Sequence, residues 1–449
     1  MGFLRQFRKT FVLLTELLII SAVVFAFVFT WTEFYPEALY LEDGNYLLVF
    51  AYAALLLLFG YLFRAFKLGM LRVHELVYSL SLSGIFSNFI MYLVLCLVAR
   101  DLLSPLAILA LTFYQIIIFW VGTIAANKVY YSVYDPRRII AVFNKGTNAG
   151  EIIRKMRNIP ERYSIEKGIT TDCPLDEIKR EIDKYEAVLI CDCAKDIKDA
   201  VFNYCYKTGK RMYIQPSPSE IIMNNTYQNQ ISDSPVLVCR NRGFSKEQRI
   251  IKRAFDFIAS GVALILLGPV MLAVAVAIRA YDGGPVFYKQ RRLTENGREF
   301  DVIKFRSMIV NAEKSGAQLA QVKDSRITPV GKFIRMVRLD ELPQLINILK
   351  GDMSIVGPRP ERPEIMAEYI EEFPEFEYRL KAKAGLTGYA QVFGKYNTTP
   401  MDKLNMDLCY IEKHSLLLDI KIMVMTFKIL FMKESTEGTE AGRPKMNKK

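Results

Sequence analysis

The strongest constraint on this chain lies near its start, in a succession of long apolar segments. Four of them cover residues 11–31, 46–63, 77–98 and 105–126. Each is close to the ~20 residues that cross the hydrocarbon core of a bilayer. The sequence therefore predicts four transmembrane helices within residues 1–130. The first is not only a cleaved signal peptide, because it lacks a clean small-residue cleavage site and a second span follows at once.

Charges in the connecting loops predict the orientation of these spans. Basic residues precede the first span or separate the second from the third: Arg5, Arg8, Lys9, Arg64, Lys67 and Arg72. The loop after the first span is acidic instead, with Glu33, Glu37, Glu42 and Asp43. Because basic loops stay in the cytoplasm, we expect everything after Ala126 to begin in the cytoplasm.

Residues 137–242 show another pattern, in which short apolar runs alternate with polar helical stretches. Runs such as RIIAVFN, EAVLICDC and RMYIQP predict strands of a small Rossmann-like domain with a parallel sheet. The turn from Gly146 to Gly150 offers backbone amides to a phosphate, but it lacks the full GxGxxG spacing. A purely structural or regulatory sheet domain is therefore favoured over a nucleotide-binding one.

Seven cysteines are scattered along the chain, mostly in segments predicted to be cytoplasmic. Disulfides are not expected in that reducing compartment. Cys191 and Cys193 alternate within one apolar run, which predicts that they share a face of a buried strand. Without histidines or a CxxC spacing they do not indicate a metal site.

A fifth apolar stretch, residues 255–280, is interrupted by Gly268 and Pro269. Proline removes a helix hydrogen bond, so the helix should bend there. Both flanks are basic, and by the positive-inside rule both ends prefer the cytoplasm. We therefore expect a re-entrant helix that dips into one leaflet, the alternative being a fifth true span.

The remainder is predicted to be a soluble α/β domain, so that the catalytic domain with its re-entrant helix spans residues 249–432. Its last apolar and basic stretch, LLLDIKIMVMTFKILFMK, suits either a helix in the headgroup plane or a helix packed in the core. The polar tail, 433–449, is expected to be disordered. The fold class is thus a membrane protein with a four-helix bundle, a Rossmann-like middle domain and a C-terminal α/β domain.

Acidic and basic groups alternate at short range in this last domain. In DVIKFRSM, Lys304 and Arg306 are two residues apart on a predicted strand, where they would form a cationic surface for a diphosphate or simply a solvated edge. In RLDELPQ, Asp340 and Glu341 are adjacent carboxylates among fixed cations. Such a pair can hold a divalent metal and keep one oxygen nucleophilic, although neighbouring acids are also common on surfaces.

A third motif places Arg359 between Pro358 and Pro360. The two prolines restrict the backbone and hold the arginine ready for bidentate contact with a phosphate. A stiff surface turn is the alternative for this motif considered alone.

These motifs occur together and in order: RAFDF, GPVFYKQRR, KFRSM, RLDELPQ, GDMSIVGPRP, GLTGYAQV and LLLDIKI. As a set, over residues 252–432, they resemble the catalytic domain of the bacterial polyprenyl-phosphate sugar phosphotransferases, also called monotopic phosphoglycosyl transferases. The preceding spans and Rossmann-like unit resemble the long-form members of that family.

The resemblance implies a chemistry for these residues. Asp340 would attack the β-phosphorus of a UDP-sugar, expelling UMP, and Glu341 together with Asp340 would hold Mg²⁺. Polyprenyl (undecaprenyl) phosphate would then take the sugar phosphate from Asp340. The family's basic positions match Lys304, Arg338 and Arg359, which would neutralise phosphates, and Asp407 or Asp419 would add a further carboxylate.

The sequence departs from the family pattern at three positions: Ala384, where proline is frequent, Thr294, where glycine is frequent, and Gly268, where smaller members often have serine. None of the three is a proposed catalytic group. They leave open the shape of the dipping helix and of two loops.

The resemblance also implies a place in the cell, the bacterial inner membrane, with the catalytic domain on the cytoplasmic face. The net charge of +12 agrees with anionic partners. Nucleic acid is not expected, because the basic residues flank apolar segments and no nucleic-acid-binding signature occurs. A homodimer is compatible with the sequence, and the transferred sugar stays open.

Two other functions compete with this hypothesis. One is a catalytically silent membrane scaffold of a polysaccharide assembly complex. The other is a membrane glycosyltransferase that forms a true glycosidic bond and releases UDP in place of UMP.

Overall fold

The computed structural model describes residues 7–39, 44–145, 149–224, 226–239, 243–310, 326–394 and 398–430. The chain divides into two compact units, Met1–Gln215 and Pro216–Lys449, and each is described here by itself. Most of the glycine turn at 146–150, the acidic residues Glu42 and Asp43, and the tail 433–449 lie outside the described residues.

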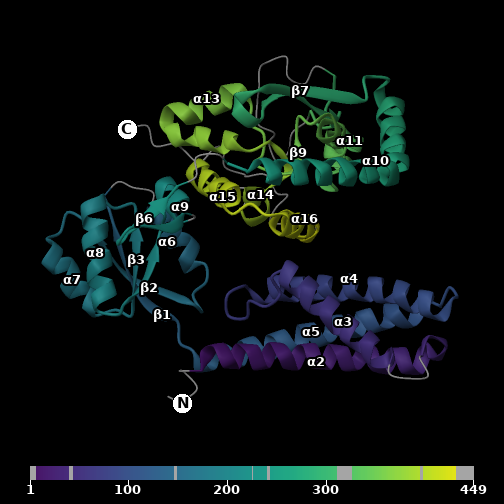
Figure 1. Cartoon of the computed structure of the whole chain (residues 1–449), viewed down its shortest axis with the longest axis horizontal. Coiled ribbons are helices and arrows are strands. Elements are labelled where there is room, and N and C mark those ends of the chain that lie inside the picture. The colour runs from purple at the N-terminus through teal and green to yellow at the C-terminus, as the bar shows by residue number, and fades with distance from the viewer. Residues whose placement is uncertain are drawn as a thin grey trace. The chain divides into compact units, whose positions relative to one another are not determined.

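The first unit opens with four long apolar helices (Figure 1): α2 (Arg8–Phe34), α3 (Gly44–Leu62), α4 (Val73–Ala99) and α5 (Leu106–Val133), with the short 3₁₀ helix η1 (Pro36–Ala38) after α2. All four are long and apolar enough to cross a membrane. They pack on one another through a core that includes Phe27, Trp31, Tyr52 and Met91. Much of their apolar surface stays exposed, as a lipid-facing helix requires.

Polar side chains link these apolar helices to one another. Gln115 Nε2 on α5 donates to the Tyr52 hydroxyl on α3 (2.8 Å), and that hydroxyl donates to Asn88 Oδ1 on α4 (2.9 Å). Asn88 Nδ2 in turn donates to Gln115 Oε1 (2.8 Å), which closes a ring of three side chains. In an apolar environment such hydrogen bonds favour this packing of the three helices over packings that would leave the polar groups unpaired.

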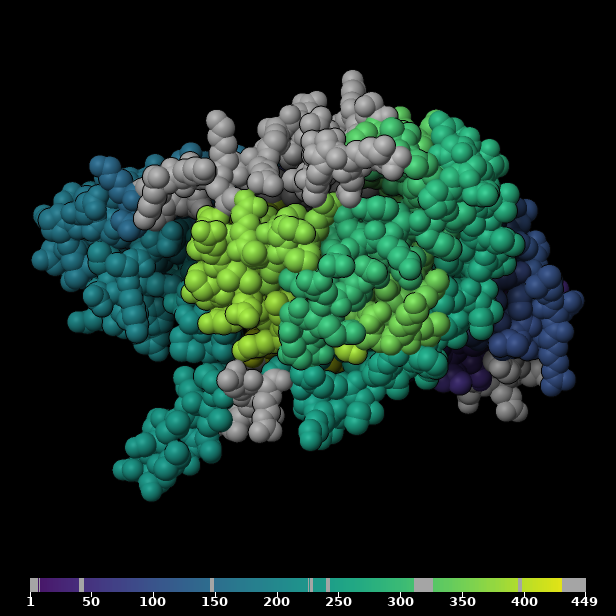
Figure 2. Space-filling view, turned by 90° about the horizontal axis from the view of Figure 1, so that it is seen from above, coloured from purple at the N-terminus to yellow at the C-terminus, as the bar shows by residue number. Residues whose placement is uncertain are grey.

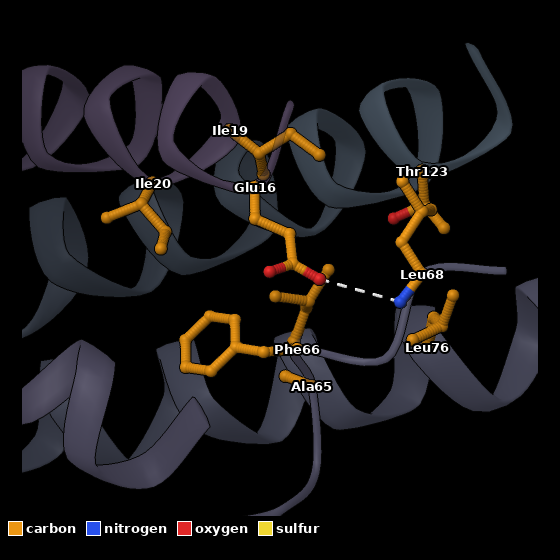
Figure 3. Close-up of a pocket in the computed structure, with 9 residues that line it drawn as sticks. Glu16, Ile19, Ile20, Ala65, Phe66, Leu68, Leu76 and Thr123 are labelled. Carbon is orange, nitrogen blue, oxygen red and sulfur yellow. Dashed lines mark hydrogen bonds between the residues drawn. The ribbon is translucent and has the colours of Figure 1, made fainter. Parts of the chain in front are cut away.

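A carboxylate also lies inside the helical part of the unit (Figure 3). Glu16 on α2 accepts a long hydrogen bond (3.5 Å) from the backbone N–H of Leu68, in the segment between α3 and α4. The small pocket around it is lined mainly by apolar groups, among them Ile19, Ile20 and Phe66. Glu16 thus ties the first helix to the segment that the sequence predicts to be cytoplasmic.

The rest of the first unit is a parallel sheet in the order β2-β1-β3-β4. Its strands are β1 (Arg137–Phe143), β2 (Tyr163–Thr170), β3 (Ala187–Cys191) and β4 (Arg211–Ile214), and its helices are α6 (Ala149–Arg157), α7 (Leu175–Asp183) and α8 (Lys195–Lys207). Strand β3 is buried along its whole length, which explains why it reads as an uninterrupted apolar run.

The two cysteines of this region do not share a strand face. Strand β3 ends at Cys191, and Asp192 takes a left-handed backbone conformation (φ 39°) that turns the chain away. Cys193 therefore lies beyond the strand, where its thiol donates to the carbonyl of Cys191 (3.1 Å). The expectation of an alternating pair failed because a positive φ ended the strand one residue after Cys191.

The second unit begins with α9 (Pro218–Met223) and the antiparallel hairpin of β5 (Tyr227–Ile231) and β6 (Ser234–Val238). Figure 2 shows this hairpin standing out from the rest of its unit. The remaining helices are α10 (Lys246–Asp282), α11 (Pro329–Met336), α12 (Gln344–Lys350), α13 (Pro363–Glu372), α14 (Tyr389–Phe393), α15 (Pro400–Glu412) and α16 (Leu416–Leu430). Short 3₁₀ helices occur at η2 (Glu295–Gly297), η3 (Leu339–Glu341) and η4 (Pro374–Lys381).

Two further strand pairs complete this unit. Strands β7 (Phe287–Leu293) and β8 (Glu299–Phe305) form an antiparallel hairpin, and β9 (Ser354–Val356) pairs in parallel with β10 (Gly385–Thr387). One part of the core gathers Met366, Phe376 and Leu404, and another gathers Ile278, Phe305 and Ile334. The chain is thus of mixed helix and sheet, with several apolar helices in its N-terminal region.

Helix α10 contains the fifth apolar stretch and keeps helical backbone through Pro269, where the sequence predicted an interruption. Figure 1 shows the helix changing direction along its length. The ends and the middle of the helix differ in burial: Asp256 and Ile278, towards the two ends, are buried, whereas Ile265 and Leu266 in the middle are more than two-thirds exposed at 79% and 72%. A proline can bend a helix without ending it, because it removes only local hydrogen bonds.

Helix α16 packs one face into the unit. Asp419, Ile422, Met425 and Lys428 are buried, while Leu417 and Phe427 are exposed. The final amphipathic stretch therefore contributes to the core, and its opposite face keeps large apolar side chains in the open.

Candidate active site

The two adjacent carboxylates lie on a sharp turn after helix α11. That helix ends at Met336, and Arg338 then adopts a left-handed backbone conformation (φ 57°) that leads into η3, which carries Asp340 and Glu341. A non-glycine residue in this region of φ is uncommon and costs conformational energy, so it is kept where the surroundings demand it. Both carboxylates are only partly buried.

Strand β8 brings the first cation to this turn. Lys304 Nζ lies 3.3 Å from Glu341 Oε1. The strand itself is held by the buried side chain of Asn347 on α12, which accepts from the Ile303 N–H (3.0 Å) and donates to the Asp301 carbonyl (2.8 Å). Lys304 is therefore fixed next to Glu341 by its own strand and by an amide that bridges to α12.

The second cation comes from the loop after β9. Arg359 Nη2 lies 3.0 Å from the same oxygen, Glu341 Oε1. Unlike Glu341, whose side chain is 14% exposed, Arg359 keeps 43% of its side chain in the open. One carboxylate oxygen thus receives two cations, and one of those cations remains accessible to an incoming anion.

These charges move the pKa values of the two carboxyls in opposite directions. Burial opposes the ionisation of Glu341, but Arg359, Lys304 and Arg338 together hold its pKa well below its usual range. Burial raises the pKa of Asp340, and the negative charge of Glu341 adds to that rise, against Lys304 and Arg335. Two carboxyls that differ in this way are suited to different roles.

Lys304 also responds to its surroundings. Burial lowers the pKa of its ammonium group, and the charge of Glu341 opposes that shift. The site therefore gathers positive charge that is only partly neutralised by the two carboxylates, an arrangement suited to a phosphate or diphosphate.

The other predicted site residues are placed differently. Strand β8 ends at Phe305, and the buried guanidinium of Arg306 pairs with Asp282 at the end of α10. Arg306 thus joins the end of the apolar helix to β8, and no described contact brings it to Glu341. Pro358 and Pro360 flank Arg359 as the sequence shows, and their carbonyls accept from the Gly385 N–H (2.9 Å) and from Arg292 Nη1 (3.1 Å).

Asp407 and Asp419 both lie in buried ion pairs. Asp407 on α15 pairs with Arg379 (2.8 Å), and Asp419 on α16 pairs with Lys252 of α10 (2.7 Å). Asp419 also accepts from the Tyr410 hydroxyl (2.8 Å). With side chains only 1% exposed, both carboxylates face protein partners.

Sequence reasoning passed over three residues that hold the site in place. Arg292 of the KQRR motif donates to the carbonyl of Pro360, and Arg379 donates to the carbonyl of Arg359 (3.0 Å). Asp256 of the RAFDF motif accepts from the backbone N–H of Ile355 on β9 (3.1 Å). The signal for Arg292 and Asp256 was their presence in the ordered motifs, whereas Arg379 stands outside every motif.

The two adjacent carboxylates, Asp340 and Glu341 (the dyad), are the groups that would hold the Mg²⁺ implied by the resemblance. Within the described residues no group of three or more His, Cys, Asp or Glu side chains converges as a complete protein cage. Mg²⁺ is commonly held by one or two carboxylates together with substrate phosphates and water. Asp340 and Glu341, adjacent on one turn and facing an anion site, fit that sparse kind of donor set.

Residues 247–433 match the family model described as bacterial sugar transferase. That range contains the dyad, Lys304 and Arg359.

Three curated relatives overlap this region. An Aeromonas hydrophila UDP-N-acetylgalactosamine-undecaprenyl-phosphate N-acetylgalactosaminephosphotransferase is 44% identical over 183 residues, 40% of this chain and 43% of the relative. A Komagataeibacter xylinus undecaprenyl-phosphate glucose phosphotransferase is 31% identical over 311 residues, 65% of this chain and 58% of the relative. A Salmonella typhimurium undecaprenyl-phosphate galactose phosphotransferase is 34% identical over 239 residues, 49% of each chain. The matches span about half the length of these relatives, whose names give different sugars.

Proposed function

We propose that this chain, whose residues 247–433 match the bacterial sugar transferase family model, transfers a sugar 1-phosphate from a UDP-sugar to polyprenyl (undecaprenyl) phosphate. The observation that carries the proposal is the double ion pair of Glu341 with Lys304 and Arg359, directly beside the Asp340 carboxyl. It combines a nucleophile with fixed positive charge, as cleavage of a diphosphate requires.

In the first step an oxygen of Asp340 attacks the β-phosphorus of the UDP-sugar. The bond from that phosphorus to the bridging oxygen breaks, UMP leaves with that oxygen, and the sugar phosphate stays on Asp340 as an acyl phosphate. Lys304 and Arg359 neutralise the charge that develops on the phosphoryl oxygens and the leaving group. Glu341 stays ionised throughout, because the cations around it hold its pKa low.

In the second step an oxygen of polyprenyl phosphate attacks the phosphorus of this acyl phosphate. The new bond completes a polyprenyl-diphosphate sugar. The bond from the phosphorus to Asp340 breaks, and Asp340 is regenerated as a free carboxylate. Bound Mg²⁺, held by Asp340 and Glu341, would supply further neutralisation of the diphosphate oxygens. The product is the lipid-linked first sugar of a polysaccharide such as a capsule, an exopolysaccharide or an O-antigen.

The membrane part of the proposal rests on the apolar helices. Helices α2 to α5 would span the bacterial inner membrane, and α10 would enter and leave on the cytoplasmic side as a re-entrant helix. Two features support the second point: the buried ends of α10 both pack within the second unit, and its exposed middle is apolar. A lipid phosphate and a soluble nucleotide could then meet at headgroup level.

The test is a panel of UDP-sugars incubated with purified protein, Mg²⁺ and polyprenyl phosphate, with the released nucleotide identified. UMP with one or more sugars is expected, whereas UDP would mean that a glycosidic bond is formed. No nucleotide release at all with an intact, folded protein would favour the silent scaffold.

A second experiment addresses the intermediate. Protein incubated with its UDP-sugar alone should gain one sugar phosphate on Asp340, seen by mass spectrometry of the peptide that contains it. Asp340→Asn should lose the adduct and lower turnover by at least about 10³-fold, as removal of a nucleophile does. Full turnover in that variant would overturn the assignment of Asp340.

A further inference from the structure

The loop that carries Arg359 is held almost entirely through its carbonyl groups. Pro358 and Pro360 have no N–H to donate, so their backbones can form hydrogen bonds only by accepting at their carbonyls from neighbouring donors. The Gly385 N–H reaches the Pro358 carbonyl (2.9 Å), Arg379 Nη2 reaches the Arg359 carbonyl (3.0 Å), and Arg292 Nη1 reaches the Pro360 carbonyl (3.1 Å). Three successive carbonyls are therefore each fixed by a different part of the unit.

Among these donors, Arg379 is the one buried in the core. Its side chain is 3% exposed, and its guanidinium lies over the ring of Phe376 at 4.8 Å. Its charge is met by Asp407 Oδ2 at 2.8 Å and by Glu361 Oε1 at 3.5 Å. The guanidinium thus contacts Asp407 on α15, the carbonyl of Arg359 and the carboxylate two residues further along the same loop.

A buried ion pair is a costly way to fill a core, because both charges lose their hydration. Apolar side chains of similar volume would stabilise the domain as well or better. What an apolar pair could not do is donate to the carbonyl of Arg359 and to Glu361 at once. The contacts that an apolar pair would lose are those made to the loop of Arg359.

We propose that Asp407 and Arg379 form a positioning pair for the transfer reaction: Asp407 orients Arg379, and Arg379 fixes the backbone of Arg359 so that its guanidinium meets Glu341. The inference rests on the proposed function. It assigns Asp407 a role through Arg359, in place of the further site carboxylate that the resemblance implied for Asp407 or Asp419. A shift of about 1 Å in a positioned group can lower a rate about a hundredfold.

A double-mutant cycle tests this claim in the full-length protein. Asp407→Asn alone should lower kcat/KM for the UDP-sugar about tenfold to a hundredfold, with loss of the fixed geometry as the cause. In a background that already carries Arg359→Ala, the same change should alter kcat/KM by no more than about twofold, because the group it positions is gone. Equal losses in both backgrounds would overturn the proposal.

Leu404→Ala is the matched control. Leu404 lies on α15, one turn before Asp407, and is fully buried in the same part of the core. Its truncation destabilises the domain without touching the loop. Leu404→Ala should change kcat/KM by the same factor, within about twofold, in the wild-type background and in the Arg359→Ala background. Arg379→Lys is the second test variant. Lysine keeps the charge that Asp407 faces but cannot contact Asp407 and the Arg359 carbonyl together, so kcat/KM should fall as it does in Asp407→Asn.

A readout that needs no substrate separates this inference from the proposed function. Hydrogen exchange of the peptide that contains Gly385, whose N–H donates to the Pro358 carbonyl (2.9 Å), should accelerate about tenfold or more in Asp407→Asn, because a released loop frees that N–H more often. The same peptide should stay unchanged in Leu404→Ala at a temperature where both variants are folded. Unchanged exchange in Asp407→Asn would refute the positioning role even if no UDP-sugar were turned over.

Discussion

Glu341 sets the charge geometry of the candidate site before any ligand arrives. One of its oxygens accepts Lys304 from a strand and Arg359 from a loop, so three segments of the chain meet at a single atom. Asn347 holds the strand next to Lys304 through the Ile303 N–H, and Arg379 holds the backbone carbonyl of Arg359. The geometry at Glu341 therefore depends on residues that never touch it.

Arg359→Lys tests whether the guanidinium shape matters beyond its charge. Lysine keeps the positive charge but loses the planar fork that can bind a carboxylate and a phosphate together, so kcat/KM for the UDP-sugar should fall about tenfold to a hundredfold. Arg298→Lys is the control, since Arg298 forms an exposed ion pair with Asp352 and should tolerate the change. Equal kinetics for the two variants would show that charge alone is needed.

The stability of the protein should report the burial of Asp407. Burial raises the pKa of this carboxyl to about 6, against the opposing charge of Arg379. In the unfolded chain the value is about 4. The folded state therefore binds the proton more tightly, and the stabilisation that this gives is lost as the pH rises through about 6.

The measurement is the Tm of wild type and of Asp407→Asn in detergent across this pH range. The difference in Tm should move in favour of the wild type as the pH falls from about 6 to about 4, because its free energy of unfolding gains up to about 1.4 kcal/mol per pH unit over the variant's. Glu361, Arg379 and Lys403 also face Asp407, and all three are common to both proteins. A difference that stays flat over this range would contradict the raised pKa.

At this scale the sequence identified residues better than it identified contacts. Lys304, Asp340, Glu341 and Arg359 stood in recognisable motifs, and the structure brings them to one place. Arg306 stood in a motif as well, but β8 ends one residue before it and its side chain turns to Asp282. The partnership of Asp407 with Arg379 joins residues 28 apart in the chain through tertiary packing, which local patterns do not report.

Among the elements, the close approach of β9 and β10 controls the position of the Arg359 loop. Gly357 follows β9 directly, and a Cβ atom built there would lie 2.2 Å from the carbonyl oxygen of Lys383. Any side chain at this position must push the two segments apart. The loop that begins at Gly357 would move with them.

Gly357→Ala should accordingly destabilise the second unit by about 1–3 kcal/mol and lower turnover beyond what the lost stability explains. The matched control is Gly261→Ala in α10, where no heavy atom lies within 4 Å of the built Cβ. That change should keep full activity and leave Tm unchanged or slightly higher, since alanine favours helix. Thermal unfolding measures the stability of each variant, and UMP release is measured below the Tm of both. Together they separate lost stability from lost turnover. Normal activity in Gly357→Ala would mean that the loop tolerates the shift.

The sequence predicted the type of the long elements and missed their ends. Apolar length indicated the helices α2 to α5, and short apolar runs indicated β1, β3 and β4. Pro269 indicated a bend, and helix α10 changes direction along its length (Figure 1) while its backbone stays helical from Lys246 to Asp282. The backbone reversals at Asp192 and Arg338, with φ of 39° and 57°, left no pattern in the sequence.

For the molecule as a whole, the positive-inside pattern makes a prediction about sides of the membrane. All seven native cysteines are first replaced by serine, because Cys239 is exposed and four others are only half-buried: Cys96, Cys173, Cys193 and Cys409. Single cysteines at Leu39, between the first two apolar helices, and at Glu299, at the start of β8, then report opposite sides. A membrane-impermeant thiol reagent applied to intact spheroplasts should label the Leu39→Cys protein at once.

The Glu299→Cys protein should be labelled only after the membrane is permeabilised. Labelling of Glu299→Cys in intact spheroplasts would mean that α10 crosses the membrane as a fifth span. The catalytic residues would then be separated from cytoplasmic UDP-sugars, so the result bears on the function as well as on the topology.

The double ion pair at Glu341 has a consequence for selectivity between ligands. The Glu341 carboxylate pairs with both Lys304 and Arg359 in the protein without ligand, so an anion that binds these cations must compete with it. A small anion such as free phosphate can offer these cations fewer contacts than a diphosphate can. On the proposed function, a nucleotide diphosphate, which brings several charged oxygens at once, is expected to compete with Glu341 for both cations and so to bind in preference to smaller anions.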